Sequence, residues 1–423
     1  MQISSCYDFC LISPLLNLKN SQRYSIMYKR KYFQRKVGSM RIAVFGGSFD
    51  PVHTEHIKLV EFALAELHLD KLFVMPAYAP PHKKGKILSP DKDRLEMCRL
   101  AFAHLDKVVV SDYEIAKGGV SYTYLTCQHF KAEYPESEIF WLVGTDMLRN
   151  FPTWKNPQEI LSCVTLAVCG RNEQEGWIEQ EQEEFFRLFE KRFVYLSYNG
   201  KDISSTKIRV LAGAGVRLSE YVPVPVEEYI RENELYKIFY ADEALALETP
   251  KRQAHSIRVA ELAAKRAVQL QISERKAIAA ALLHDCAKNL AENSPYLTGF
   301  SLPTEWGEVP SEVVHQFAGA FVCEKVFGIT DEELLNAVRY HTSGRPNMRT
   351  LEKLIFLADM LEVERNYDCV DRLRALFWKD LDLCLKTALY ETLKFLEKKG
   401  GGVYPLTKLA YEYCANKEEN NEE

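Results

Sequence analysis

Residues 41–56 read RIAVFGGSFDPVHTEH, and this stretch decides the fold of the first half of the chain. An apolar run typical of a buried strand leads directly into Gly46 and Gly47, and a helical pattern begins near His53. Glycines at the end of a parallel strand allow a sharp turn and a close approach to an anion, and the following helix N-terminus favours negative charge. His53 and His56 are three residues apart, so both imidazoles lie on one face of the first helical turn. The stretch therefore predicts a strand–loop–helix unit that binds phosphate.

Further strand-like runs follow, most of them about 30 residues apart. All six runs cover residues 41–45, 71–75, 107–111, 138–143, 164–169 and 192–196. Continuous apolar runs are typical of strands buried on both faces, and their alternation with helical segments predicts a parallel sheet covered by helices. Between the last two runs, the glutamate-rich segment 173–190 is interpreted as a solvated helix.

The strand pattern stops near Tyr236, and only helices are predicted beyond it. They cover residues 254–270, 274–289, 311–327, 331–340, 350–362 and 380–399. A change from α/β to all-α pattern predicts two domains. Their expected bounds are 40–236 and 242–415, with a short linker at 237–241, a dispensable or non-native extension at 1–39, and a disordered tail at 416–423.

The composition excludes several classes of protein. The 423 residues carry a net charge of −5, which argues against a general nucleic-acid binder. No apolar run is long enough for a transmembrane helix. Eleven cysteines without a C-x-x-C pair are typical of reduced thiols. We therefore expect a soluble, cytoplasmic, multidomain protein that binds neither nucleic acid nor membranes.

Six further motifs follow the first stretch along the chain. They read PPHK at 80–83, DRLEM at 93–97, SYT at 121–123, GTD at 144–146, PTW at 152–154 and SSTKIR at 204–209. In this order, residues 40–236 resemble the H-x-G-H nucleotidyltransferases, and most closely bacterial nicotinate-nucleotide adenylyltransferase. The resemblance implies a Rossmann-like α/β domain that transfers the adenylyl group of ATP to nicotinate mononucleotide. Deamido-NAD and pyrophosphate would be the products, with Mg²⁺ on the phosphates.

The resemblance also implies a role for each motif. His53, His56 and Arg209 would be catalytic. The residues that would bind the phosphates of ATP are Gly46, Gly47, Ser48, Phe49, Lys83, Ser204, Ser205 and Arg209. Nicotinate mononucleotide would contact Thr123, Asp146 and Trp154, with the indole as a stacking surface for the pyridine ring.

Glu55 departs from the pattern of this family, because it stands where the signature has glycine and gives H-T-E-H. A carboxylate at this position could obstruct or repel phosphate. It could equally point outward, since it lies on a different helix face from His53. We expect that Glu55 is tolerated.

Four of the ten histidines lie beyond residue 240, each on or at the end of a predicted helix. They and two nearby carboxylates are His255, His284, Asp285, His315, His341 and Asp359. Imidazole and carboxylate together suit a first-row transition metal such as iron, manganese or zinc. Their order predicts a metal site in the helical domain.

This order resembles the HD phosphohydrolases, and more closely the bacterial HD family that splits diadenosine tetraphosphate symmetrically into two ADP. The matching segments are 249–256, 281–288, 315–320, 339–346, 358–365 and 405–411. The resemblance implies an all-α domain with Fe²⁺/Fe³⁺ or Mn²⁺.

The metal ligands implied by this resemblance are His255, His284, Asp285 and Asp359, and Asp285 would be catalytic. The residues expected to face substrate phosphates or a second metal are His315, His341, Thr342, Lys288 and Arg365. Two alternatives stay open. The HD half could be a non-catalytic nucleotide sensor, and the transferase half could use another acceptor, such as pantetheine phosphate or FMN.

Overall fold

A computed structural model describes residues 39–79, 88–170, 176–400 and 402–419. These residues form two compact units. The first comprises the described residues up to Ile203 except 88–89, and the second comprises residues 88–89 and the described residues from Ser204 onward. The predicted extension 1–39 lies outside the described residues except for Ser39.

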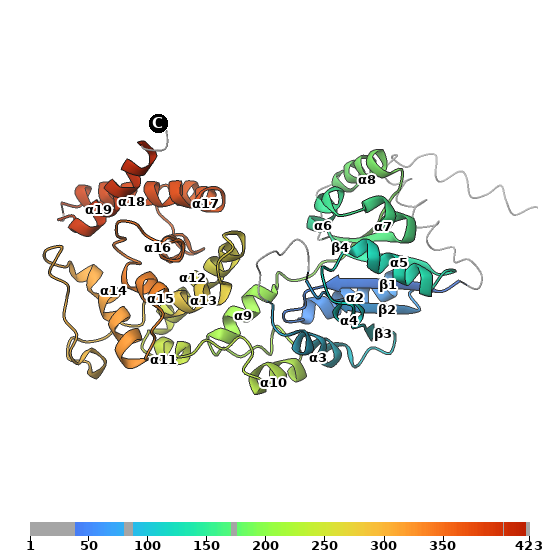
Figure 1. The fold of residues 1–423 in the computed structure, drawn as a ribbon, viewed down its shortest axis with the longest axis horizontal. Helices are drawn as coiled ribbons and strands as arrows, with labels where there is room; N and C mark the ends of the chain where they lie inside the picture. The colour runs from blue at the N-terminus through green and yellow to red at the C-terminus, as the bar shows by residue number, and fades with distance from the viewer. Residues whose placement is uncertain (1–38, 80–87, 171–175, 401, 420–423) are drawn as a thin grey trace, which may run out of the picture. The chain divides into compact units, whose positions relative to one another are not determined.

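The first unit contains a six-stranded parallel sheet (Figure 1). Its strands are β1 (Arg41–Gly47), β2 (Lys71–Pro76), β3 (Val108–Val110), β4 (Glu138–Gly144), β5 (Thr165–Gly170) and β6 (Val194–Ser197). Their order is β3-β2-β1-β4-β5-β6, the Rossmann-like arrangement that was expected. In the register of the central strand, Val44 lies opposite Phe73 of β2 and Trp141 of β4. The strand order reverses between β1 and β4, so their carboxyl ends mark the place where such sheets bind ligands.

Helices connect these strands. They are α2 (Thr54–Glu66), α3 (Asp91–Phe102), α4 (Tyr113–Lys117), α5 (Thr123–Glu133), α6 (Thr145–Asn150), the short η3 (Phe151–Thr153), α7 (Pro157–Cys163) and α8 (Trp177–Phe189). Helix α8 is the described part of the predicted solvated helix. Its Phe185 and Phe189 are buried in the core of the sheet, so one side of this helix is not solvated.

The regular elements of the second unit are all helices within its described residues, as expected (Figure 1). Its elements are α9 (Ser205–Gly213), α10 (Val224–Glu232), α11 (Ala241–Ala246), α12 (Pro250–Gln269), α13 (Glu274–Leu283), η4 (Pro295–Leu297), α14 (Ser311–Phe321), the π-helical η5 (Val322–Val326), α15 (Glu332–Arg339), α16 (Thr350–Leu361), α17 (Val370–Lys379), α18 (Leu381–Lys398) and α19 (Pro405–Glu419). Among the described residues, no helix is long and apolar enough to cross a membrane.

The division between the units differs from the predicted linker at 237–241. It falls at Ser204, because α9 packs on the helical unit. Val210 of α9 is fully buried in the same apolar core as Val259 and Ala263 of α12. The C-terminus differs too, since α19 includes residues 416–419 of the predicted disordered tail.

Candidate functional site

His53 and His56 lie together at the start of α2, just beyond the carboxyl end of β1. Their ring centroids are 3.6 Å apart and the rings are stacked at 21°. The backbone N–H of His53 donates to Nδ1 of His56 at 3.2 Å. Burial lowers the pKa of His53 to about 4, against the opposing charge of Glu55, so this imidazole is uncharged near neutral pH. The pair offers ring nitrogens to an anion at the edge where the strand order reverses.

Gly46 and Gly47, which end β1, have aromatic rings against them. A Cβ at Gly46 would lie 3.1 Å from Cζ2 of Trp141, and one at Gly47 would lie 3.0 Å from Cζ of Phe49. Both distances are tighter than ordinary van der Waals contacts. The absence of side chains at these positions therefore lets the rings pack against the strand end, a requirement that the sequence did not reveal.

A buried arginine holds the loop after β1. The Arg94 residue is fully buried, and its Nη1 donates to the backbone carbonyl of Ser48 at 2.8 Å. The same guanidinium pairs with Asp91 at the start of α3. The ring of Phe49 packs edge-on against that of His56 with centroids 5.1 Å apart. This loop is thus fixed by α3 on one side and by the first turn of α2 on the other.

The residues predicted to contact nicotinate mononucleotide have different surroundings. Thr123 is half-buried at the start of α5, and Asp146 is exposed in α6, directly after β4. Trp154 is only 8% exposed and packs on Phe151 with centroids 5.3 Å apart. The roles of Thr123 and Asp146 stay predictions. The packing of Trp154 in the core counts against an open stacking surface in this conformation.

Ser204 and Ser205 lie at the start of α9, in the second unit. The hydroxyl of Ser204 caps this helix by accepting from the backbone N–H of Lys207 at 3.2 Å. Their predicted phosphate contacts stay predictions. Lys83, the other predicted phosphate ligand, lies outside the described residues.

Arg209, predicted to clamp phosphate, contacts a carboxylate instead. Its Nε donates to Oε1 of Glu274 at 3.0 Å, and its Nη2 donates to Oγ1 of Thr206 at 3.0 Å. Glu274 is the first residue of α13, and both charged side chains are largely buried. A phosphate would have to compete with Glu274 for this guanidinium, so the catalytic role of Arg209 stays a prediction.

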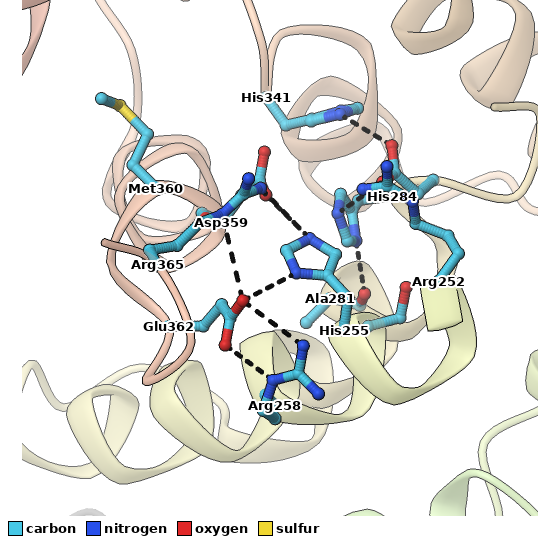
Figure 2. Close-up of polar contacts among 12 residues, drawn as sticks. Arg252, His255, Arg258, Ala281, His284, His341, Asp359, Met360, Glu362 and Arg365 are labelled. Carbon is cyan, nitrogen blue, oxygen red and sulfur yellow. Dashed lines mark hydrogen bonds and ion pairs between the residues drawn. The ribbon is translucent and has the colours of Figure 1, made fainter. Parts of the chain in front are cut away.

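The predicted metal ligands of the helical unit converge (Figure 2). His255 comes from α12, Asp359 from α16, and His284 and Asp285 from the turn after α13. Nε2 of His255 lies 2.9 Å from Oδ1 of Asp359. Oδ2 of Asp285 lies 3.4 Å from Nε2 of His284 and accepts from Arg252 at 2.8 Å. The predicted helix 274–289 ends at Leu283, and the turn that follows directs two of these side chains toward the others.

The orientation of the imidazoles fits a metal site. Nδ1 of His284 donates to the carbonyl of Ala281 at 2.7 Å, and Nδ1 of His341 donates to that of Val338 at 2.7 Å. A hydrogen bond at Nδ1 leaves the Nε2 lone pair for a metal. Nε2 of His284 is buried and lies within the cluster, with Oδ2 of Asp285 3.4 Å away. Three overlapping groups of His and Asp in this cluster have their ligand atoms within 4.8 Å of one another.

The carboxylates carry the negative charge that a cation requires. Burial opposes ionisation of Asp285, but the neighbouring imidazoles outweigh it and hold the pKa of this carboxyl well below its usual range. The same balance lowers the pKa of Asp359, where the bond to His255 is the leading favourable contact. Burial lowers the pKa of His284, but the charges of Asp285 and Asp359 and the bonds to Asp285 and the Ala281 carbonyl together outweigh it and raise the pKa to about 9. In the free protein the cluster is therefore held together by charge pairs.

The residues predicted to face phosphates lie beside the ligands. His315 of α14 lies 3.0 Å from Nε2 of His341 and 3.2 Å from Oδ1 of Asp285. Nζ of Lys288 lies 3.0 Å from the ring nitrogens of His315, and Oγ1 of Thr342 lies 3.1 Å from its Nε2. Burial lowers the pKa of His315 to about 4 and also lowers that of Lys288.

Arg365 contacts the predicted ligand Asp359, because its Nη2 donates to Oδ1 of that residue at 2.6 Å. Its side chain is 38% exposed, so it also reaches solvent. The structure therefore brings the predicted ligands and the predicted phosphate-facing residues into one cluster.

Sequence reasoning missed the buried Glu362 behind His255 (Figure 2). Its Oε1 accepts from Nδ1 of His255 at 3.2 Å, and its Oε2 accepts from Nε of Arg258 at 2.7 Å. Arg258 lies one turn after His255 on α12, so this spacing is the only sequence signal for the arrangement. Arg252, in contact with Asp285, also had no predicted role.

Two family models match the chain. One is described as cytidylyltransferase-like and matches residues 44–211, and the other is described as the HD domain and matches residues 252–364. Together they cover the strand-end loop with His53 and the metal cluster.

Relatives resemble either both halves or one of them. A probable nicotinate-nucleotide adenylyltransferase/Ap4A hydrolase of Mycoplasma genitalium is 29% identical over 338 residues, which are 78% of this chain and 89% of that protein. A probable nicotinate-nucleotide adenylyltransferase of Clostridium botulinum (strain Langeland) is 35% identical over 200 residues, 46% of this chain and 98% of that protein. Among solved structures, a protein from Clostridium acetobutylicum described as a predicted HD superfamily hydrolase involved in NAD metabolism is 34% identical, with a TM-score of 0.38, over 42% of this chain and 95% of that one.

Proposed function

We propose that this chain, which belongs to the nicotinate-nucleotide adenylyltransferase family and carries an HD domain in its second half, catalyses two reactions on nucleotides. The first half transfers the adenylyl group of ATP to nicotinate mononucleotide. The second half hydrolyses diadenosine tetraphosphate symmetrically to two ADP.

The stacked pair of His53 and His56 at the end of β1 is the observation that supports the transferase most directly. In this reaction the phosphate of the mononucleotide attacks the α-phosphorus of ATP in line, and pyrophosphate leaves. No enzyme nucleophile is needed, because positioning and charge stabilisation carry phosphoryl and nucleotidyl transfer. Each of the two imidazoles donates one ring N–H to the phosphate oxygens as negative charge develops on them in the transition state. Mg²⁺ enters with ATP.

A panel of acceptors tests the transferase. Purified protein is incubated with ATP, Mg²⁺ and either nicotinate mononucleotide, nicotinamide mononucleotide, phosphopantetheine or FMN, and pyrophosphate release is measured. We expect fastest turnover with nicotinate mononucleotide and deamido-NAD as the product. Preference for another acceptor would contradict the proposed substrate while leaving the reaction class intact.

The cluster of His255, His284, Asp285 and Asp359, which belong to overlapping groups of closely spaced ligand atoms, is the observation that supports the hydrolase. Its nitrogen and oxygen donors suit iron, manganese or zinc, and Nε2 of His284 is buried in the cluster, 3.4 Å from Oδ2 of Asp285. A cation bound there supplies Lewis-acid chemistry and a water of lowered pKa.

The surrounding residues position the substrate. Lys288, which contacts His315, and Arg365, which contacts Asp359, offer positive charge to the phosphate chain, and the Thr342 hydroxyl offers a hydrogen bond. His315 is uncharged near neutral pH because burial lowers its pKa to about 4, so it contributes as a neutral ring. Asp285 contacts three imidazoles and orients them about the reacting phosphate.

Chromatography of the products tests the hydrolase. With Fe²⁺ or Mn²⁺ and diadenosine tetraphosphate, we expect ADP as the sole product. The Asp285→Ala variant loses bound metal and hydrolysis and keeps adenylyl transfer. Full metal loading of the wild type without turnover would favour the nucleotide sensor, and ATP plus AMP as products would contradict the symmetric cut.

A further inference from the structure

Glu55 lies in the first turn of α2, between His53 and His56 in the sequence, and is only 6% exposed. Its Oε2 accepts from the hydroxyl of Tyr198 at 2.8 Å and from the backbone N–H of Lys201 at 2.8 Å. Its Oε1 accepts from Nζ of Lys58 at 3.0 Å. The carboxylate is therefore hydrogen-bonded to the segment that follows β6, residues 198–201, and paired with a lysine of its own helix.

The segment 198–201 is shaped around this carboxylate. A Cβ at Gly200 would collide with Oε2 of Glu55 and with the ring of Tyr198, so only glycine fits there without a shift. The Tyr198 ring also packs near that of Phe62 on α2, with centroids 5.5 Å apart. Two contacts, one polar and one aromatic, thus join this segment to α2.

The electrostatics also favour the arrangement. Burial alone would raise the pKa of Glu55, but the hydrogen bonds from Tyr198, Lys58 and Lys201 outweigh it and lower the pKa below its ordinary value. Glu55 is thus ionised at neutral pH, in the first turn of a helix where negative charge is favourable. Its charge also favours the protonated form of His53, in opposition to burial.

We propose that Glu55 is a positioning residue of the transferase half, which ties residues 198–201 to the first turn of α2 and so fixes the orientation of His53 and His56. The inference rests on the proposed transferase function. The residue that replaces the signature glycine is then required in this chain, because the segment after β6 is built to receive its carboxylate. Substituting glycine at this position removes the acceptor for all three donors and releases the helix start.

Steady-state kinetics with ATP test the positioning role. We expect Glu55→Gly to lower kcat/KM by about 10- to 100-fold, since small displacements of catalytic groups have effects of this size. Glu55→Gln retains most of the activity, because one amide oxygen can still accept from Tyr198 and Lys201. Glu61→Gln is the matched control, an acid on the same helix whose side chain is 47% exposed, and we expect no change. A Glu55→Gly enzyme as active as the wild type, or more active, would overturn the proposal.

Amide hydrogen exchange at Lys201 separates this inference from the proposed function. We expect faster exchange in Glu55→Gly than in the wild type and no change in Glu61→Gln. An unchanged exchange rate in Glu55→Gly would overturn the proposal that Glu55 holds residues 198–201, even if the enzyme is active. If the wild type transfers no adenylyl group, the proposed function fails, and the exchange rate still tests whether Glu55 holds residues 198–201. Tyr198→Phe, which removes one donor and keeps the ring, serves if Glu55→Gly does not fold, and it should show the same two effects at smaller size.

Discussion

The carboxylate of Glu362 accepts from Nδ1 of His255, while Asp359 lies at the opposite ring nitrogen. An outer carboxylate of this kind fixes the ring of a metal ligand and raises its basicity. We predict that Glu362→Gln weakens metal binding about 10- to 100-fold, because a neutral amide is a poorer acceptor and leaves Arg258 without its buried partner. Calorimetric titration of metal-free protein with Mn²⁺ measures the change.

Glu364→Gln is the control for this prediction. Glu364 pairs with the same arginine, Arg258, but its side chain is 66% exposed. Removing its charge therefore tests the loss of an ion pair without touching His255. Equal weakening by both variants would show that Arg258, and not the contact to His255, controls the affinity.

The types of residue in each site could be predicted from sequence, but their supporting partners could not. The order of histidines and aspartates indicated the metal cluster because several scarce, chemically matched side chains recur on successive helices. The contact of Glu362 with His255 spans 107 positions in the sequence, and that of Tyr198 with Glu55 spans 143. A single glutamate or tyrosine carries no sequence signal that distinguishes it from the many on the protein surface. Only the fold brings them to the site.

At the scale of elements, the junction between α11 and α12 holds a buried acid, Glu248. Burial raises its pKa from 4.5 to about 7, although the charge of His284 and a hydrogen bond from Ser256 oppose this. A raised pKa means that the folded state binds the proton more tightly than the unfolded state. The stability this provides is complete below pH 4.5 and is lost as pH rises through about 7.

We therefore predict that Glu248→Gln stabilises the metal-free protein at pH 8, by up to about 3 kcal/mol, and has little effect near pH 5. Glutamine cannot ionise, and its amide oxygen still accepts from Ser256. Urea unfolding at the two pH values measures the difference, and Glu308→Gln, at an exposed position, is the control. A stabilisation of equal size at both pH values would mean that ionisation is not its cause.

The elements themselves were predictable to different degrees. All six strands lie within two residues of the predicted bounds at each end, because buried parallel strands are continuous apolar runs. Helix α19 was not predicted. The end of the α/β pattern was placed near Tyr236, but α9 packs on α12, and such packing has no signal in local sequence.

At the scale of the whole molecule, the two sites share no residue, and the strand-end histidines and the metal cluster belong to different compact units. If each site acts alone, each can be removed alone. We predict that His53→Ala abolishes adenylyl transfer and leaves metal content and hydrolysis of diadenosine tetraphosphate unchanged. Metal-free wild-type protein supplied with Mg²⁺ only should show the reverse, with transfer intact and hydrolysis restored by Mn²⁺ or Fe²⁺.

The pair of measurements is sharper than either one, because a general loss of folding would impair both reactions at once. His68→Ala, on the same unit and outside the strand-end loop, is the control and should keep both activities. Loss of hydrolysis in His53→Ala with metal still bound could not come from the cluster itself, whose ligands and bound metal are intact. It would mean that the state of the first site sets the activity of the second. This outcome would contradict the prediction that the two sites act independently.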